Sequence, residues 1–281
     1  MQLRVRYAYD PLLFRSHVES FLAEREAENN LVFGILAGVT DGMQKFSHDR
    51  PLFVSVEGNV GIQLVAVRTP PFNLVLSTAK TDEAVSFLAR KMHAERHQLP
   101  GVTASSREGD VFARAWSGIS GSKVRREHSQ RIYRLDRAIP PRPVAGHLHL
   151  CDEPDIHQAT EWMRAFNLDV GENQIPADPR RFIGRHDAAL FFWIDGRPVS
   201  MTGFSGPTPN GIRIGAVFTP PELRRRGYAS ACVAAVSQSV LDAGRKFCFL
   251  YTDLANPTSN HIYQEIGYQP VCDGEVLRFE D

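Results

Sequence analysis

The sequence has no net charge, few cysteines and no long run of apolar residues. Lys plus Arg and Asp plus Glu both number 32, so the chain of 281 residues carries no formal charge with its histidines neutral. Balanced charge disfavours a protein that coats nucleic acid or lies on an anionic membrane. No uninterrupted apolar stretch reaches the ~18 residues that a membrane-spanning helix needs. We therefore expect a soluble, folded protein with no nucleic-acid or membrane partner.

The cysteines are too few and too far apart to staple the chain or to form a C-x-x-C site. They are Cys151, Cys232, Cys248 and Cys272. The first residues interleave charged and apolar side chains, so they do not resemble a secretory signal. These features predict reduced thiols, mostly packed in cores, in a cytoplasmic protein.

The length is comfortable for two domains, and one segment is suited to divide them. Residues 138–146 contain three prolines and a glycine, through which neither a helix nor a strand continues easily. We place the boundary there, which predicts domains 1–140 and 141–281.

Both halves contain the same predicted order of elements: helices, three antiparallel strands, helix, strand, helix and strand. In the first half, helices over 10–39 (with a break near residues 28–30), 81–93 and 107–117 accompany strands over 52–56, 62–67, 72–76 and 130–136. In the second half, helices over 154–166, 179–185, 227–243 and 257–266 accompany strands over 189–194, 199–204, 212–218, 247–252 and 270–279. This order predicts a mixed α+β protein in which one ancestral fold occurs twice.

A basic loop opens the long helix of the second half. The strand over 212–218 ends at two prolines, and Arg224, Arg225 and Arg226 then precede Gly227 and the helix. Free N–H groups at a helix N-terminus, a glycine and several arginines are suited to bind a diphosphate. Taken alone, the same residues also fit a solvated loop.

A second segment follows the strand over 247–252. Asn256 and Pro257 are typical of a helix start, and Gly267 is typical of a helix end. Tyr263 lies within this helix. On its own it also fits an ordinary half-buried aromatic side chain.

The two segments together resemble the GNAT superfamily of acyl-CoA-dependent N-acyltransferases. The cofactor motif of that superfamily, Gln/Arg-x-x-Gly-x-Gly/Ala, matches Arg224 to Ala229. Its later motif, Asn-x-x-Ala-x-x-x-Tyr-x-x-x-Gly-Phe, matches Asn256 to Tyr268, with Ser259 in place of alanine and Tyr268 in place of phenylalanine. The order and spacing of the motifs, with a strand between them, make the resemblance specific. It implies two GNAT-like domains, each a mostly antiparallel twisted sheet flanked by helices.

The resemblance also implies a role for each matched residue. The backbone of Val217, Phe218 and Thr219 would meet the pantetheine arm, with the Val217 N–H near the thioester carbonyl. The diphosphate would be cradled by backbone N–H groups, with help from the arginine side chains, in the segment formed by Arg224, Arg225, Arg226, Gly227, Tyr228, Ala229 and Ser230. Asn256, Ser259 and Asn260 would line the far side of acetyl-CoA. Tyr263 would sit beside the thioester sulfur and donate a proton to the leaving thiolate.

The implied function is transfer of an acetyl group from acetyl-CoA to a primary amine of a small molecule or peptide. The alternative is an acyl-CoA-binding regulatory or structural protein without turnover. The base that activates the amine stays open, because Glu222, Asp253 and His261 fit ordinary surface or loop positions equally well and water could also accept the proton. The acceptor amine and the oligomeric state also stay open.

The first half departs from the family at the cofactor loop. After the strand over 72–76 it has neither a glycine turn nor a basic loop, and Asp82 and Glu83 begin the next helix. These carboxylates suit the helix dipole but repel a diphosphate. We therefore expect a degenerate GNAT-like domain that binds no acyl-CoA. In the second half, His147 and His149 share one face of an expected strand, but no third ligand is evident nearby, so we expect no metal site.

Overall fold

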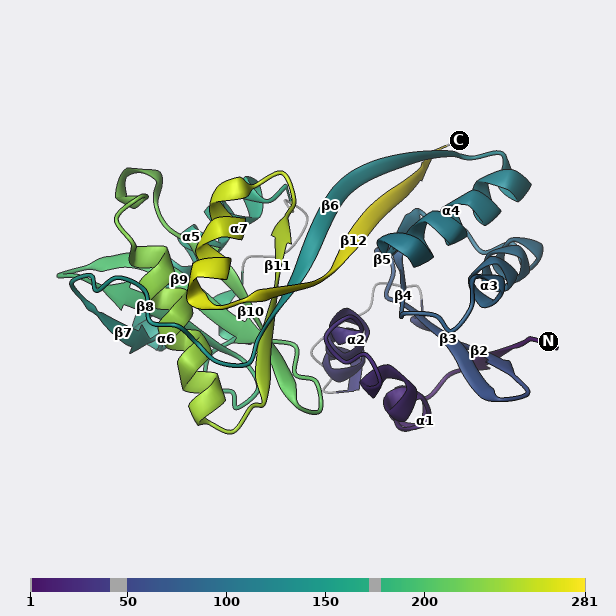
Figure 1. Ribbon diagram of the computed structural model, residues 1–281, viewed down its shortest axis with the longest axis horizontal. Coiled ribbons are helices and arrows are strands. Elements are labelled where there is room, and N and C mark those ends of the chain that lie inside the picture. Colours follow the sequence, from purple (N-terminus) through teal and green to yellow (C-terminus); the bar gives the residue numbers. More distant parts are fainter. Residues whose placement is uncertain (1, 41–49, 172–177, 281) are drawn as a thin grey trace. The chain divides into compact units, whose positions relative to one another are not determined.

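A computed structural model describes residues 2–40, 50–171 and 178–280, and the chain divides into two compact units. Unit 1 comprises Met1–Ile132, Asp253–Ala255 and Val271–Asp281. Unit 2 comprises Tyr133–Thr252 and Asn256–Pro270. Each unit is a β-sheet with helices packed on it (Figure 1), so the predicted mixed α/β class is confirmed.

The described residues of unit 1 form four helices and a largely antiparallel set of strands. The strands contributing to it are β1 (Arg4–Ala8), β2 (Leu52–Gly58), β3 (Gly61–Arg68), β4 (Leu74–Leu76), β5 (Gly101–Ser105), β6 (Lys123–Leu135) and β12 (Gln269–Glu280). The helices are α1 (Pro11–Ala23), α2 (Asn30–Thr40), α3 (Asp82–Ala94) and α4 (Ser106–Ser120). The strand order is β1-β2-β3-β4-β5-β12-β6, and β4 and β5 are parallel.

Alternation along the strands of unit 1 builds a core on each face of the sheet. On β3, Leu64 and Ala66 pack with α3 and α4, whereas Val65 and Val67 pack with α1 and α2. All four side chains are fully buried. The central strands are therefore apolar on both faces, which explains why they read as continuous apolar runs.

The last strand belongs to unit 1, which differs from the predicted limits of 1–140 and 141–281. Residues Gly274–Arg278 of β12 pair antiparallel with β5. Arg131 of β6 donates two hydrogen bonds to Asp273 of β12, at 2.6 and 2.9 Å. The units also divide at residues 132 and 133, within β6, rather than at the proline-rich segment. The limits of the two units are set by strand pairing between residues far apart in the sequence. The amino-acid composition of a linker contains no information about that pairing.

In the described part of unit 2, three helices accompany a mixed set of strands. Besides the end of β6, its strands are β7 (His147–Leu150), β8 (Ala189–Ile194), β9 (Pro198–Ser205), β10 (Gly211–Phe218) and β11 (Phe247–Asp253). Its helices are α5 (Ile156–Asp169), α6 (Tyr228–Asp242) and α7 (Pro257–Ile266). The strand order is β6-β11-β10-β9-β8-β7, with β10 and β11 parallel and β7 to β10 antiparallel.

Two cores lie on the two faces of the unit 2 sheet. Helices α6 and α7 pack on Ile212 and Ile214 of β10, and α5 packs on Leu190 and Phe192 of β8. The predicted three antiparallel strands followed by helix, strand, helix and strand are confirmed in this order. The helix expected over 179–185 is only a short 3-10 turn, Pro179–Arg181. None of the helices in the described ranges is long and apolar enough to cross a membrane.

Candidate functional site

Strand β10 is irregular where it reaches the motif residues. Its pairing with β9 shifts between Gly215 and Phe218, and Ala216 has a positive φ of 51°. The fully buried Ser200 hydroxyl spans this bulge, because its Oγ lies 3.2 Å from the Phe218 carbonyl and 2.9 Å from Thr219 Oγ1. Bulges re-aim backbone groups and side chains. The end of β10 is therefore held in a shape that differs from a regular strand.

The parallel pairing of β10 with β11 is short. It joins Gly211–Arg213 to Phe247–Phe249, at the beginning of both strands, although both strands continue further. In open α/β sheets, ligands bind at the carboxyl ends of neighbouring parallel strands. The segments after these two strands, which carry the two sequence motifs, therefore begin at the edge where a ligand is expected.

The N-terminus of α6 has N–H groups that no group in the described part of the chain caps. Gly227 occupies the N-cap position with a φ of +83° and supplies no side chain. The first hydrogen bond into the helix runs from the Ala231 N–H to the Gly227 carbonyl, at 3.0 Å. Among the residues that the structure describes, none accepts a hydrogen bond from the N–H groups of Tyr228, Ala229 or Ser230. These donors are suited to an anion.

The three arginines before this helix differ in what they contact. Arg224 donates to the Thr219 carbonyl at 2.9 Å and forms an ion pair with Asp169 at 2.6 Å. Its side chain therefore braces the loop. Arg225 and Arg226 are exposed, and Arg225 has a positive φ of 65°. They are the two arginines of the loop with no ion pair among the described residues.

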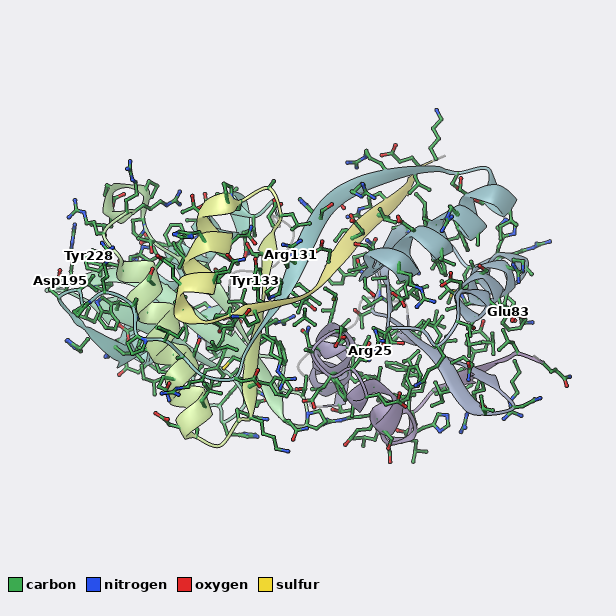
Figure 2. All side chains as sticks on the ribbon, viewed as in Figure 1. Arg25, Glu83, Arg131, Tyr133, Asp195 and Tyr228 are labelled. Carbon is green, nitrogen blue, oxygen red and sulfur yellow. The ribbon has the colours of Figure 1, made fainter. Side chains whose placement is uncertain are left out.

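Tyr228 holds the start of α6 to the turn between β8 and β9. Its hydroxyl donates to Asp195 Oδ2 at 2.6 Å, and Figure 2 labels the two residues side by side. The hydrogen bond to this carboxylate raises the pKa of the Tyr228 hydroxyl, so the phenol keeps its proton. The sequence assigned Tyr228 only a backbone role, and no spacing rule linked it to Asp195.

The polar residues of α7 have roles within the helix and its packing. Asn256 caps the helix by accepting a hydrogen bond from the Ser259 N–H at 3.0 Å. Asn260 accepts a hydrogen bond from the Tyr133 hydroxyl at 3.0 Å and donates to the Asn256 carbonyl at 2.7 Å. Tyr133 is fully buried and was not singled out from the sequence. Asn256 and Asn260 therefore shape α7, whatever they do toward a ligand.

Tyr263 is a core residue of unit 2. It is 8% exposed, and its ring centroid lies 6.0 Å from that of Tyr268. Burial raises the pKa of the Tyr263 hydroxyl to about 12. No described residue forms a hydrogen bond with this hydroxyl. The proton is therefore firmly held and has no acceptor within the described protein.

The side chains of Val217 and Phe218, two residues predicted to contact acetyl-CoA, lie on opposite faces of the sheet. Val217 packs at the edge of the hydrophobic cluster that contains Tyr263 and the buried face of α6. The Phe218 side chain lies on the opposite face of the sheet, against Trp162 of α5 at a centroid distance of 5.8 Å. Both motifs therefore meet on the face of unit 2 that carries α6 and α7.

The residues considered as bases remain unassigned. The His261 side chain is 72% exposed and lies 3.4 Å from Glu265. Glu222 is exposed, and Asp253 is counted in unit 1. None of the three is buried beside the motif residues.

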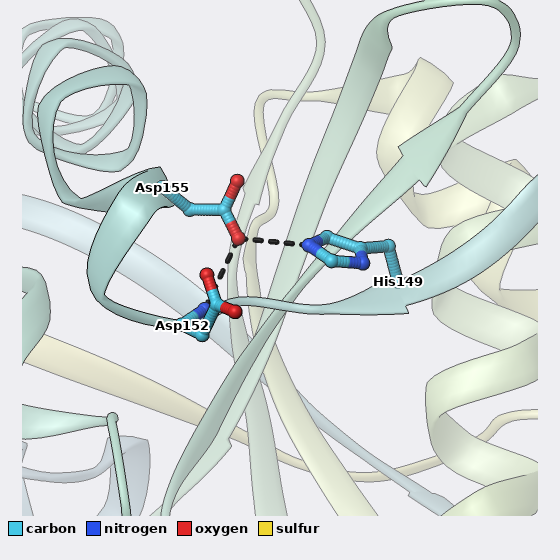
Figure 3. A group of neighbouring side chains, drawn as sticks. All are labelled: His149, Asp152 and Asp155. Atoms are coloured by element: carbon cyan, nitrogen blue, oxygen red, sulfur yellow. Dashed lines mark hydrogen bonds and ion pairs between the residues drawn. The ribbon is translucent and has the colours of Figure 1, made fainter.

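One group of metal-ligating side chains lies near the start of α5 (Figure 3). One ligand atom each of His149, Asp152 and Asp155 lies within 4.8 Å of the others. Asp155 Oδ2 accepts a hydrogen bond from the Asp152 N–H at 3.0 Å and contacts His149 Nε2 at 2.8 Å. Together with the Asp152 side chain, these contacts form a capping box. The group is therefore explained as the start of a helix. Of the two histidines that the sequence places on one strand face, His149 belongs to the group and His147 does not.

The corresponding loop of unit 1 is closed by its own side chains. After β4, the Thr78 N–H donates to Asn29 Oδ1 at 2.8 Å and the Ala79 N–H donates to Glu108 Oε1 at 3.0 Å. Glu108 is 4% exposed. Thr81 then caps α3 with its side chain. The donors that are open in unit 2 are therefore already used in unit 1.

Comparisons with known proteins agree with this geometry. Residues 206–276, which contain both motifs, match the family described as FR47-like protein. No curated protein matches the chain by sequence. A GCN5-related N-acetyltransferase from Kribbella flavida is 16% identical with a TM-score of 0.56, over 78% of this chain and 87% of that one.

Two further solved structures resemble nearly the whole chain. A tandem GNAT protein from the clavulanic acid biosynthesis pathway is 12% identical with a TM-score of 0.62, over 98% of this chain and 97% of that one. A GCN5-related N-acetyltransferase from Sphaerobacter thermophilus is 14% identical with a TM-score of 0.57, over 98% and 95%. These likenesses show the fold, which is that of two GNAT-like domains. The family match covers the segment in which the two motifs resemble those of the GNAT superfamily.

Proposed function

We propose that unit 2 is an N-acetyltransferase that transfers an acetyl group from acetyl-CoA to a primary amine. The observation that carries this proposal is the uncapped N-terminus of α6 after a loop of three arginines, within the segment that matches the family model. The GNAT fold supports acyl-CoA-dependent acetyl transfer in general. The acetyl specificity, the amine acceptor and a cytoplasmic location are parts of the proposal.

The residues at this terminus fit a diphosphate. The N–H groups from Tyr228 to Ser230 are open donors, and Gly227 lets a ligand approach the backbone closely. Arg225 and Arg226 are exposed and can neutralise its charge. Arg224, which braces Thr219 and Asp169, would hold the loop in place while its backbone contributes to the cradle. Unit 1 lacks such donors, so we assign it no acyl-CoA.

The end of β10 would orient the reacting end of the cosubstrate. Bound acetyl-CoA supplies an acetyl group that its thioester activates toward an amine. The backbone of Val217, Phe218 and Thr219 would contact the pantetheine arm, and Ser200 fixes the bulge that presents it. The Val217 N–H would donate a hydrogen bond to the thioester carbonyl, where negative charge develops during acyl transfer. Ser259 and the ordered start of α7 would form the other wall.

Tyr263 is assigned the proton for the leaving thiolate, and its burial sets a condition on that role. An ordinary thiol has a pKa of about 8.5. Because the Tyr263 hydroxyl has a pKa of about 12, transfer of its proton to such a thiolate is uphill by about 5 kcal/mol. A general-acid role therefore requires that the pKa of this hydroxyl fall when the site is filled. Otherwise the hydroxyl orients the sulfur through a hydrogen bond and water supplies the proton.

The raised pKa of the Tyr263 hydroxyl also agrees with the second candidate function, an acyl-CoA-binding protein without turnover. A phenol that keeps its proton and a site with no assigned base are both compatible with binding alone. Acyl-CoA binding is common to both candidates, and release of free CoA in the presence of an amine separates them.

The first experiment measures acetyl-CoA binding to the full chain by calorimetry and its release of CoA with pools of amines. We expect binding in the wild type and loss of binding in Arg226→Glu, because this change places a carboxylate beside the α6 N-terminus. Arg164→Glu is the matched control, since Arg164 is an exposed arginine of unit 2 that is not part of the loop.

The controls decide between the outcomes. An equal loss of acetyl-CoA binding in Arg226→Glu and Arg164→Glu would indicate a general effect of the changed charge. An absence of acetyl-CoA binding in the wild type would refute both candidate functions. Binding without CoA release for any amine pool would favour the non-catalytic candidate.

A further inference from the structure

Unit 1 contains a pocket of about 160 Å³ that the proposed activity does not use. It lies where the parallel strands β4 and β5 end, since Thr78–Lys80 follow β4 and Arg107 lies in the first turn of the helix after β5. Phe21, Glu24 and Arg25, at and just after the end of α1, complete it. The carboxyl ends of neighbouring parallel strands are where α/β sheets bind ligands.

The pocket is lined by three cationic side chains from three separate segments. They are Arg25, Lys80 and Arg107, and Glu24 is the one carboxylate among the lining residues. Lys80 contacts Glu24 and lies 5.7 Å from the centroid of the Phe21 ring. The lining therefore combines an excess of positive charge with an apolar wall.

Lys80 and Arg107 form ion pairs with exposed carboxylates, whereas Arg25 forms no ion pair among the described residues. Arg107 also lies 4.0 Å from the carboxylate of the buried Glu108. The Lys80–Glu24 and Arg107–Asp82 ion pairs join side chains that are all at least 47% exposed. Exposed ion pairs contribute only about 0–1 kcal/mol, so a ligand can compete for their cations. The Arg25 side chain makes no ion pair or hydrogen bond with the described chain. It is labelled in Figure 2.

The volume of the pocket and the hydrogen bonds of its backbone limit which ligand it can bind. A cavity of about 150 Å³ accommodates a molecule the size of benzene, so a ligand of a few heavy atoms fits. The N–H groups of Thr78 and Ala79 already donate to Asn29 and Glu108. A ligand would therefore be held by the charged side chains rather than by a backbone cradle, which differs from the open α6 terminus of unit 2.

We propose that this pocket binds a small oxyanion, a carboxylate or phosphate group, through Arg25, Lys80 and Arg107. The site is independent of the acetyltransferase proposal, because all its residues belong to unit 1. Glu24 competes with the ligand for Lys80, so it limits the affinity.

The test titrates inorganic phosphate and, separately, succinate into the full chain carrying Arg226→Glu, which disables the anion site proposed for unit 2. Calorimetry at constant ionic strength measures the dissociation constant. We expect saturable binding of at least one anion, and the tighter of the two identifies the source of the oxyanion. Arg25→Gln should weaken this binding at least tenfold, and Glu24→Gln should strengthen it severalfold.

Arg90→Gln is the matched control, because Arg90 is an exposed arginine on α3 outside the pocket. It should leave the dissociation constant unchanged. The proposal is overturned if neither anion binds, if Arg25→Gln and Arg90→Gln have equal effects, or if Glu24→Gln weakens binding. Binding of CoA to the Arg226→Glu chain with loss in Arg25→Gln would also overturn it, since the site would then take a nucleotide.

Discussion

Substituting Gly227 by alanine should separate backbone strain from ligand binding at the α6 N-terminus. Gly227 has a φ of +83°, and a Cβ added there would lie 2.9 Å from Val144 Cγ1. An L-residue in the left-handed region costs roughly 1–2 kcal/mol. The loss of chain entropy in the unfolded state offsets about 0.4–1 kcal/mol of this cost.

The other end of the same helix provides the matched control. Gly244 follows α6 with a φ of +95°, and a Cβ there would meet nothing within 4 Å. Gly244→Ala therefore introduces the backbone strain of a positive φ without a steric contact of the new methyl group. We expect it to destabilise unit 2 by about 1 kcal/mol. Gly227→Ala should cost the same amount plus whatever the displacement of the Val144 methyl group requires.

The ligand provides the second readout. A Cβ at Gly227 stands at the open N–H groups of α6, so Gly227→Ala should weaken acetyl-CoA binding tenfold or more, whereas Gly244→Ala should leave it unchanged. Urea unfolding gives the stability difference, and calorimetry gives the dissociation constant. Equal acetyl-CoA affinity in the two alanine variants would refute the assignment of this terminus to the diphosphate. Equal stability of Gly244→Ala and the wild type would refute the strain argument.

Two further predictions concern a proton in each unit. Tyr263→Phe keeps the buried ring and removes only the hydroxyl, so the affinity for acetyl-CoA should stay unchanged. If this hydroxyl is the general acid, kcat should fall by about 10²–10⁴. An unchanged rate in single-turnover kinetics would reject that role. In unit 1, burial alone would raise the pKa of the Glu57 carboxyl, but hydrogen bonds from Arg4, His17 and Ser55 outweigh it and hold the pKa below 4.5. The stability that this carboxylate contributes is present above pH 4.5 and is lost as the pH falls through its folded pKa. Glu57→Gln should therefore cost about 1–3 kcal/mol at pH 7, with the difference from the wild type shrinking below pH 4.5 in denaturation curves; a constant difference would contradict the assignment.

Much of the local structure of unit 2 is predictable because its signals are short-range. Pro257 and Gly267 mark the two ends of α7, and the helix is observed over Pro257–Ile266 as expected. The motif residues that bind through the backbone need only a turn and a helix start, which Gly227 encodes. The same reasoning fails over 179–185, where Gly184 adopts a φ of +69° and only a 3-10 turn forms.

The sequence by itself determined the fold class, the order of elements and the two motifs, because these depend on residue periodicity and on spacing along the chain. The tertiary structure alone decided that β12 completes the sheet of unit 1, since pairing with β5 joins residues far apart in sequence. It also decided that Arg224 braces Asp169 and that Glu108 closes the unit 1 loop. Finally, the raised pKa of Tyr263 follows from burial among side chains of several elements, and burial is a property of the packed core that no local pattern contains.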